Sequence, residues 1–162
     1  MGELVLAYCP SPLGMLEVAG SETGIRAVCF LDDPLPAPGA PDLPAPLVSC
    51  VQQLAEYFAG QRRSFEVPLD MQGTPFQLRV WELLLHIPFG ETRTYLDIAL
   101  ALGDPKAVRA VGAANGQNPV PIIVPCHRVI GGDGTLIGYG GGLWRKEWLL
   151  RHEGRPVQPR LF

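Results

Sequence analysis

The chain has 162 residues, of which 47% are hydrophobic and 18% charged, and its formal net charge is −3. This composition is typical of a soluble globular protein with one medium domain or two small lobes. No apolar run approaches the roughly 18 residues of a membrane-spanning helix, and the N-terminus lacks the features of a signal peptide, so we expect a cytoplasmic protein.

The charge is distributed unevenly along the chain. Residues 1–75 hold 3 basic and 9 acidic side chains, whereas residues 76–162 hold 10 basic and 7 acidic ones. An acidic first half and a mildly basic second half indicate different tasks for the two halves.

The first part of the chain has the pattern of a small α/β lobe, residues 1–72. Three short β-rich segments, 4–8, 14–18 and 25–30, are separated by turn residues and predict an antiparallel sheet. A Pro-rich stretch over about 34–46 follows and is typical of a surface loop or stiff linker. Apolar residues at helical spacing then predict a helix over 48–59.

The second part, residues 73–162, is predicted to be mostly helical. Thr74 and Pro75 form a helix start, and an apolar stripe continues to Ile87. Two short helices over 95–102 and about 106–115, joined by a Gly-containing turn, have the spacing of a helix-turn-helix. A last helix is expected over 143–152, and the fold class is therefore α+β.

The second short helix consists mostly of small residues with one long basic side chain, Arg109. Small residues permit close packing against a neighbouring helix. They would equally let the helix approach a nucleic-acid duplex while Arg109 reaches into it. The stretch by itself leaves both interpretations open.

The four cysteines are Cys9, Cys29, Cys50 and Cys126, with spacings of 20, 21 and 76 residues. These spacings match neither a zinc ribbon nor a dense disulfide framework. The first three lie among apolar residues, where a free cysteine is usually a small buried hydrophobe. A structural zinc site that combines Cys9, Cys29 and a distant histidine is the alternative.

Only Cys126 has chemically useful neighbours, because His127 and Arg128 follow it directly. A thiol reacts as its thiolate, so a reactive cysteine needs a proton acceptor or a positive field nearby. Pro125 disfavours continuous helix, so we expect the Cys-His pair on a turn or at a strand end. Adjacency alone does not establish contact between the two side chains.

Six motifs occur in order between Gly73 and Gly154. They are GTPFQ at 73–77, IPFGET at 87–92, RAVG at 109–112, NP at 118–119, PCHRVI at 125–130 and GYGG at 138–141. In this order and spacing they resemble the O6-alkylguanine-DNA alkyltransferases, also called methylated-DNA–protein-cysteine methyltransferases. The first 72 residues resemble the variable N-terminal lobe of that family only in broad pattern.

The resemblance implies DNA repair by direct, irreversible transfer of an alkyl group such as methyl. The group would pass from O6-alkylguanine in DNA to Cys126, once per molecule. His127 would take the thiol proton through a water, Glu153 would orient and stabilise the imidazolium, and Asn118 would hold the turn before the cysteine segment.

The resemblance also implies a partner, double-stranded DNA bound through its minor groove, with the damaged nucleotide flipped out of the stack. Arg109 would fill the vacated space, and Tyr95 would push the 3′ phosphate and contact the base. The residues assigned to DNA binding and flipping are Arg109, Tyr95, Ala110, Ala113, Ala114 and Arg128. Those assigned to the guanine pocket are Tyr95, Val129, Tyr139 and Gly140. Phosphate contacts are expected from Arg93, Lys106, Arg128, Arg145 and Lys146.

We expect a monomer without a cofactor. Some members of the family bind zinc in the N-terminal lobe, but residues 1–72 of this chain contain no histidine. His86 and His152 are expected to be structural or exposed, and Trp81, Trp144 and Trp148 to lie in the core.

Three functions stay open at this point. Besides the alkyltransferase, the scaffold fits a non-catalytic sensor of alkylated DNA, although such proteins replace the reactive cysteine. A cysteine hydrolase that turns over, or a transcription factor with Cys126 as a redox switch, is the third interpretation.

Overall fold

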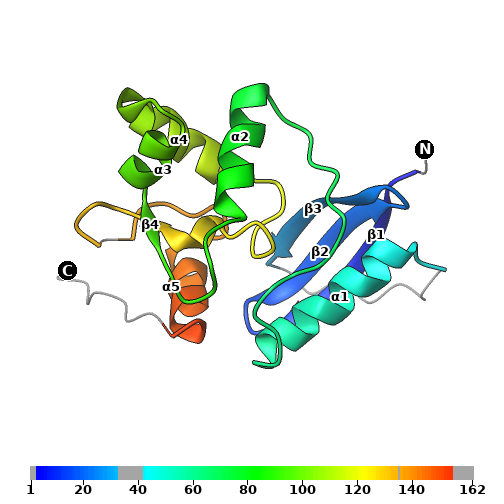
Figure 1. The fold of residues 1–162 in the computed structure, drawn as a ribbon. Helices are drawn as coiled ribbons and strands as arrows, with labels where there is room; N and C mark the ends of the chain where they lie inside the picture. Colours follow the sequence, from blue (N-terminus) through cyan, green and yellow to red (C-terminus); the bar gives the residue numbers. More distant parts are fainter. Residues whose placement is uncertain (1–2, 33–41, 135, 155–162) are drawn as a thin grey trace. The chain divides into compact units, whose positions relative to one another are not determined.

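The structure, a computed structural model, describes residues 3–32, 42–134 and 136–154 (Figure 1). It divides into two compact units: residues 1–72 together with 119–121, and residues 73–118 together with 122–162. The short segment 119–121 belongs to the first unit, where the Pro119 carbonyl accepts a hydrogen bond of 2.9 Å from the amide of Val28.

The first unit is built on a three-stranded antiparallel sheet in the order β1 (Val5–Ser11), β2 (Gly14–Ser21) and β3 (Gly24–Leu31). Side chains alternate between the two faces, as the period of a strand requires. Cys9, Leu16 and Val28 are buried on one face, whereas Glu17 and Cys29 pair on the other. The predicted sheet is confirmed.

Helix α1 (Ala45–Phe58) packs against all three strands of this sheet (Figure 1). It begins three residues earlier than the predicted helix and has Pro46 in its first turn. Proline is tolerated there because the first amides of a helix have no intrahelical acceptor. The Pro-rich loop therefore ends at Pro44, and its residues 33–41 lie outside the described part of the chain.

The second unit begins with α2 (Pro75–Leu84), which has a capping box. The hydroxyl of Thr74 accepts from the amide of Gln77, and the side chain of Gln77 accepts from the amide of Thr74. The helix ends at Leu84, three residues before the end of the apolar stripe, and a turn brings Ile87 back to the core.

The predicted helix-turn-helix is present. It comprises α3 (Tyr95–Ala101), the short 3₁₀ helix η1 (Pro105–Ala107) and α4 (Val108–Gly116). Figure 1 shows α3 and α4 as neighbouring helices beside α2. The last helix, α5 (Leu143–His152), has the predicted bounds.

Two very short strands were not predicted. β4 (Arg93–Thr94) pairs in parallel with β5 (Val129–Ile130). Two residues are too few for a periodicity signal. The pairing has a consequence for the site, because it places the start of α3 next to the segment that follows Cys126.

Three expectations about burial need correction. Trp81 is 1% exposed, but Trp144 is 54% exposed and Trp148 is half-buried and stacks on His152. Cys29 is exposed rather than buried, because its strand position points to the sheet face opposite α1. His86 is exposed, as expected.

Within the described residues, no group of three or more His, Cys, Asp or Glu side chains could hold a metal ion. None of the described helices has the length and apolar character needed to cross a membrane.

Trp81 ties α2 to α4, since its indole Nε1–H donates to the carbonyl of Ala114 at 2.9 Å. We expect Trp81→Phe to lower the free energy of unfolding by about 1–2 kcal/mol, because it removes a buried hydrogen bond and leaves a small cavity. Urea unfolding followed by circular dichroism measures this. Trp144→Phe, at an exposed position, is the control and should change stability by less than about 0.5 kcal/mol. Equal effects of the two substitutions would contradict the prediction.

Candidate active site

The Cys-His pair lies on a single 3₁₀ turn, η2 (Cys126–Arg128), which follows Pro125 and continues directly into β5. The side chains of all three residues of the turn are buried. The expected turn at a strand end is confirmed.

Glu153, the residue directly after α5, is the centre of a buried ionic cluster with His127 and Arg128. Its Oε2 atom lies 2.8 Å from His127 Nε2, and Arg128 donates to Oε1 at 2.7 Å and to Oε2 at 2.9 Å. A third guanidinium N–H donates to the carbonyl of Ile87. The cluster joins η2 to the end of α5 and to the turn after α2.

The cluster determines which nitrogen of His127 carries a proton. Burial lowers the pKa of His127, and the neighbouring carboxylate opposes this only in part, so the imidazole is neutral at pH 7. A carboxylate only accepts hydrogen bonds, so Nε2 carries the proton toward Glu153. Nδ1 therefore has its lone pair available and makes no hydrogen bond within the described residues. His127 is arranged as a base.

Cys126 is 5% exposed, and burial raises the pKa of its thiol. Several groups oppose this effect and favour the thiolate. They are a side-chain hydrogen bond from Asn118, the positive charge of Lys146, and the amides of Cys126 and His127. Asn118 also donates to the carbonyl of Val124 at 2.8 Å, so it holds the chain just before the turn.

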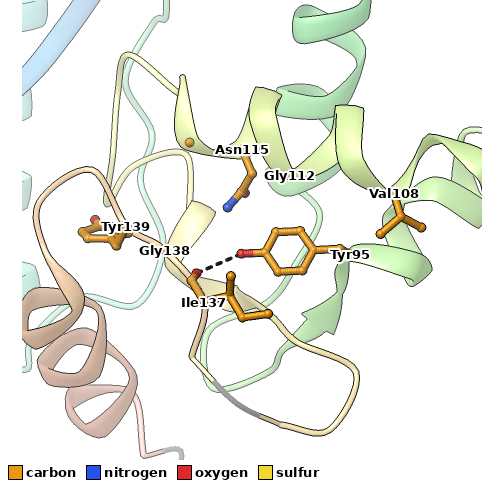
Figure 2. A pocket seen from close by; sticks show the side chains of 8 residues that line it. Tyr95, Val108, Gly112, Asn115, Ile137, Gly138 and Tyr139 are labelled. Atoms are coloured by element: carbon orange, nitrogen blue, oxygen red, sulfur yellow. Dashed lines mark hydrogen bonds between the residues drawn. The ribbon is translucent and has the colours of Figure 1, made fainter.

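A cavity of about 330 Å³ lies between α3, α4 and residues 137–139. Cys126 is not among the residues that line it, and the cavity is connected to the cysteine turn through Asn115. Figure 2 shows the predicted residues Tyr95 and Tyr139 on its walls, with Asn115 pointing between them. The other lining residues are Val108, Gly112, Gly116, Ile137 and Gly138. Val129 and Gly140, also predicted for the pocket, are not among the residues that line it.

Asn115 connects this pocket to the turn that holds Cys126. It is buried, lines the cavity, and donates from Nδ2 to the carbonyl of Cys126 at 3.3 Å. The sequence analysis did not identify it, because an asparagine inside a helix of small residues carries no motif of its own. The spacing of six residues from Arg109 places Asn115 on another face of α4, and this spacing could have indicated that Asn115 does not belong to the exposed face.

Helix α4 presents two different faces. Arg109, Ala110 and Ala113 are exposed, as a surface that approaches DNA requires. Ala114, which was predicted to share that surface, is 2% exposed, and its carbonyl accepts a hydrogen bond from Trp81 of α2. Its small size serves helix packing rather than a free surface.

Three of the five cations expected to contact phosphates are buried. Arg128 is paired with Glu153, Arg145 donates to the carbonyl of Gly141 at 2.8 Å, and Lys146 is fully buried. Their N–H groups are used by the protein itself, so they do not contribute an exposed positive surface. Arg93 and Lys106 keep exposed or half-exposed side chains.

Sequence profiles of known families match both parts of the chain. The profile described as "6-O-methylguanine DNA methyltransferase, DNA binding domain" matches residues 75–155, and the one described as "6-O-methylguanine DNA methyltransferase, ribonuclease-like domain" matches residues 4–71.

Curated and solved relatives agree with these matches. A methylated-DNA–protein-cysteine methyltransferase of Mycolicibacterium paratuberculosis is 49% identical over 157 residues, 94% of each chain. A crystal structure of the Mycobacterium tuberculosis O6-methylguanine methyltransferase is 44% identical, covers 97% of both chains and has a TM-score of 0.83. A crystal structure of a Mycobacterium tuberculosis relative in complex with DNA is 49% identical over 92% of both chains, with a TM-score of 0.82.

The ionic cluster predicts a pH-dependent stability. Burial raises the pKa of Glu153, but the hydrogen bonds from His127 and Arg128 and the positive charge of Arg128 outweigh it and hold that pKa well below its usual range. A carboxylate with a depressed folded-state pKa contributes stability that is fully present above its unfolded-state pKa, about 4.3, and is lost as the pH falls toward the folded-state value.

We therefore expect Glu153→Gln to lower the free energy of unfolding at pH 7 by about 3–5 kcal/mol, since it leaves Arg128 buried without its partner. The difference from the unaltered protein should be constant near neutral pH and shrink below about pH 4. Urea unfolding at several pH values tests this. Glu147→Gln, which removes a surface pair with Arg151 on α5, is the control. A difference that stays constant down to pH 3 would refute the role of the cluster.

Proposed function

The chain belongs to the methylated-DNA–protein-cysteine methyltransferase family, and we propose that Cys126 is the residue that accepts the alkyl group. The protein is a DNA repair enzyme that transfers alkyl groups from O6-alkylguanine in DNA to its own cysteine, once per molecule. The observation that carries the assignment is the arrangement of Cys126 next to the His127–Glu153 pair and connected through Asn115 to the cavity of about 330 Å³. Cys29, by contrast, pairs with Glu17, whose negative charge raises the pKa of the Cys29 thiol and so disfavours its thiolate.

The chemistry follows from this arrangement. His127 Nδ1 takes the proton of Cys126 through a water molecule, and Glu153 stabilises the imidazolium that results. The thiolate attacks the O6-bound carbon of the alkyl group, a C–S bond forms, and the C–O6 bond breaks. The electron pair of that bond stays on the base, which takes up a proton and becomes guanine. The thioether is not readily hydrolysed, so the reaction ends there.

DNA recognition is assigned to the exposed face of α4. Its small residues Ala110 and Ala113 let the helix approach the minor groove, and Arg109 fills the space that the flipped nucleotide leaves. Tyr95 and Tyr139, which line the cavity, receive the base. Because the thiol of Cys126 is buried, the base has to enter the protein to react, and the cavity next to Asn115 is the site proposed to receive it.

The remaining assignments follow the family. Residues 1–72 form an N-terminal lobe, and residues 73–162 form the domain that binds DNA and accepts the alkyl group. We propose a monomer that acts without a cofactor in the cytoplasm, in association with the nucleoid if the source is prokaryotic.

Duplex DNA with O6-methylguanine should transfer one methyl group per chain to Cys126. Mass spectrometry of the intact protein and of its peptides measures the gain and its position. Cys126→Ala should abolish transfer, whereas Cys29→Ala, which removes an exposed thiol, should react at the same rate as the unaltered protein. Repeated turnover would favour a hydrolase, and binding of the lesion without transfer would favour a sensor.

Arg109→Ala should slow repair of duplex DNA by about 10- to 100-fold, because flipping costs a few kcal/mol that the arginine offsets. Reaction with free O6-benzylguanine needs no flipping and should change by less than about twofold. Arg151→Ala, an exposed arginine on α5, is the control for charge alone. Equal losses of rate on both substrates would contradict a role of Arg109 in nucleotide flipping.

A further inference from the structure

Asn115 has a buried side-chain oxygen that accepts no hydrogen bond from the described residues. The residue is 5% exposed, and its Oδ1 atom is buried without a donor. An unpaired buried acceptor is costly, so such an atom in a folded protein calls for an explanation. The other polar atom of the same amide, Nδ2, is used, because it donates to the carbonyl of Cys126 at 3.3 Å.

The hydrogen bond to Cys126 fixes the orientation of the Asn115 amide. A carbonyl only accepts hydrogen bonds, so the nitrogen of the amide has to face the carbonyl of Cys126, and Oδ1 cannot take its place. Asn115 also lines the cavity, and Figure 2 shows its side chain pointing between Tyr95 and Tyr139. The side chain therefore carries an unused acceptor at the boundary between the cavity and the cysteine turn.

The walls of the cavity do not supply the missing donor. The hydroxyl of Tyr95 donates to the carbonyl of Ile137 at 3.0 Å, as the dashed line in Figure 2 shows. Five other lining residues have no side-chain donor at all. They are Val108, Gly112, Gly116, Ile137 and Gly138. A donor for Asn115 Oδ1 therefore has to come with the molecule that occupies the cavity.

O6-alkylguanine has a single donor on the edge that carries the alkyl group. Alkylation of O6 leaves N1 without a proton, so O6 and N1 are both acceptors, and the 2-amino group is the donor of that edge. Because the thiol of Cys126 has to reach the alkyl group, this edge faces the turn to which Asn115 is bonded. The corresponding edge of O4-alkylthymine carries O4, N3 and O2, which are all acceptors.

We propose that Asn115 is a specificity-determining residue, whose Oδ1 accepts a hydrogen bond from the 2-amino group of the flipped O6-alkylguanine and so selects this base over alkylated bases that lack the group. This inference rests on the proposed function, because it assumes that the alkylated base occupies the cavity. The amino group pairs an acceptor that the protein leaves unsatisfied. O4-alkylthymine instead places its O2 acceptor against Oδ1, and both oxygens stay buried without a donor, which a polar site rejects strongly.

The experiment compares two free bases that differ only in the group that Asn115 is proposed to bind. O6-benzylguanine carries the 2-amino group, whereas 6-benzyloxypurine has a hydrogen in its place, and neither needs nucleotide flipping. The measurement is the second-order rate constant of Cys126 alkylation by each base, followed by mass spectrometry of the intact protein. The ratio of the two rate constants is the preference for the amino group. Intrinsic differences in reactivity between the bases cancel when this ratio is compared between variants.

Two substitutions of Asn115 separate its acceptor from its donor. Asn115→Leu removes both polar atoms at nearly the same size, whereas Asn115→Asp keeps an oxygen acceptor and loses the amide. In Asn115→Leu the preference for O6-benzylguanine should fall about 10- to 100-fold, the loss expected for a buried hydrogen bond. Asn115→Asp should keep the preference, whatever happens to the two individual rates. Gln117→Leu, which removes an exposed amide directly after α4, is the matched control and should leave both rates unchanged.

A binding measurement separates failure of this proposal from failure of the proposed function. Titration calorimetry with Cys126→Ala measures affinity for the two bases without alkyl transfer. If neither base alkylates Cys126 in the unaltered protein, the proposed function fails. The proposal about Asn115 then still requires Cys126→Ala to bind O6-benzylguanine more tightly than 6-benzyloxypurine, and to lose this difference when Asn115→Leu is added.

The proposal is overturned if Asn115→Leu keeps the preference of the unaltered protein, or if Asn115→Asp loses it. Equal losses of rate on both bases in Asn115→Leu also overturn it, because they indicate that Asn115 acts only through its hydrogen bond to the carbonyl of Cys126.

Discussion

The active site depends on one buried carboxylate, that of Glu153. It accepts hydrogen bonds from His127 and Arg128, which follow Cys126 on the same short turn. Because Glu153 directly follows α5, its carboxylate fixes the turn against the end of that helix, 25 residues beyond Arg128 in the sequence. The same interaction places the proton of His127 on Nε2 and leaves Nδ1 as a base. One ionic cluster thus sets both the position of the cysteine turn and the protonation state of His127.

The helices with clear end signals could be predicted well from the sequence. Thr74 and Thr94 both begin capping boxes, and α3 and α5 have almost the predicted bounds. The strands β4 and β5 could not be predicted, since each has two residues and their pairing joins positions 36 residues apart. Local pattern contains no information about such a pairing.

The turn that holds the Cys126–His127 pair could be predicted from the sequence, but the burial of several charged residues could not. A run such as Trp144-Arg145-Lys146 has the composition of an exposed helix surface. The acceptors of these buried cations are backbone carbonyls of β5 and of residues 137–141. Backbone carbonyls are present at every position of a chain. Which of them converge on one ammonium is decided by tertiary structure. Ala114 illustrates the same limit, because a small residue suits a packed face and a free face equally well.

The burial of Arg128, Arg145 and Lys146 also changes how the protein would hold undamaged DNA. Each cation that contacts a phosphate releases condensed counterions, and this release supplies most of the sequence-independent affinity. Among the described cations expected to contact DNA, Arg93, Lys106 and Arg109 keep exposed or half-exposed side chains. With about three phosphate contacts, the logarithm of the binding constant would fall with the logarithm of the salt concentration at a slope of about −3. With so shallow a salt dependence, the protein would dissociate quickly from undamaged duplex. Its residence at a lesion would then depend on binding of the base in the cavity rather than on charge.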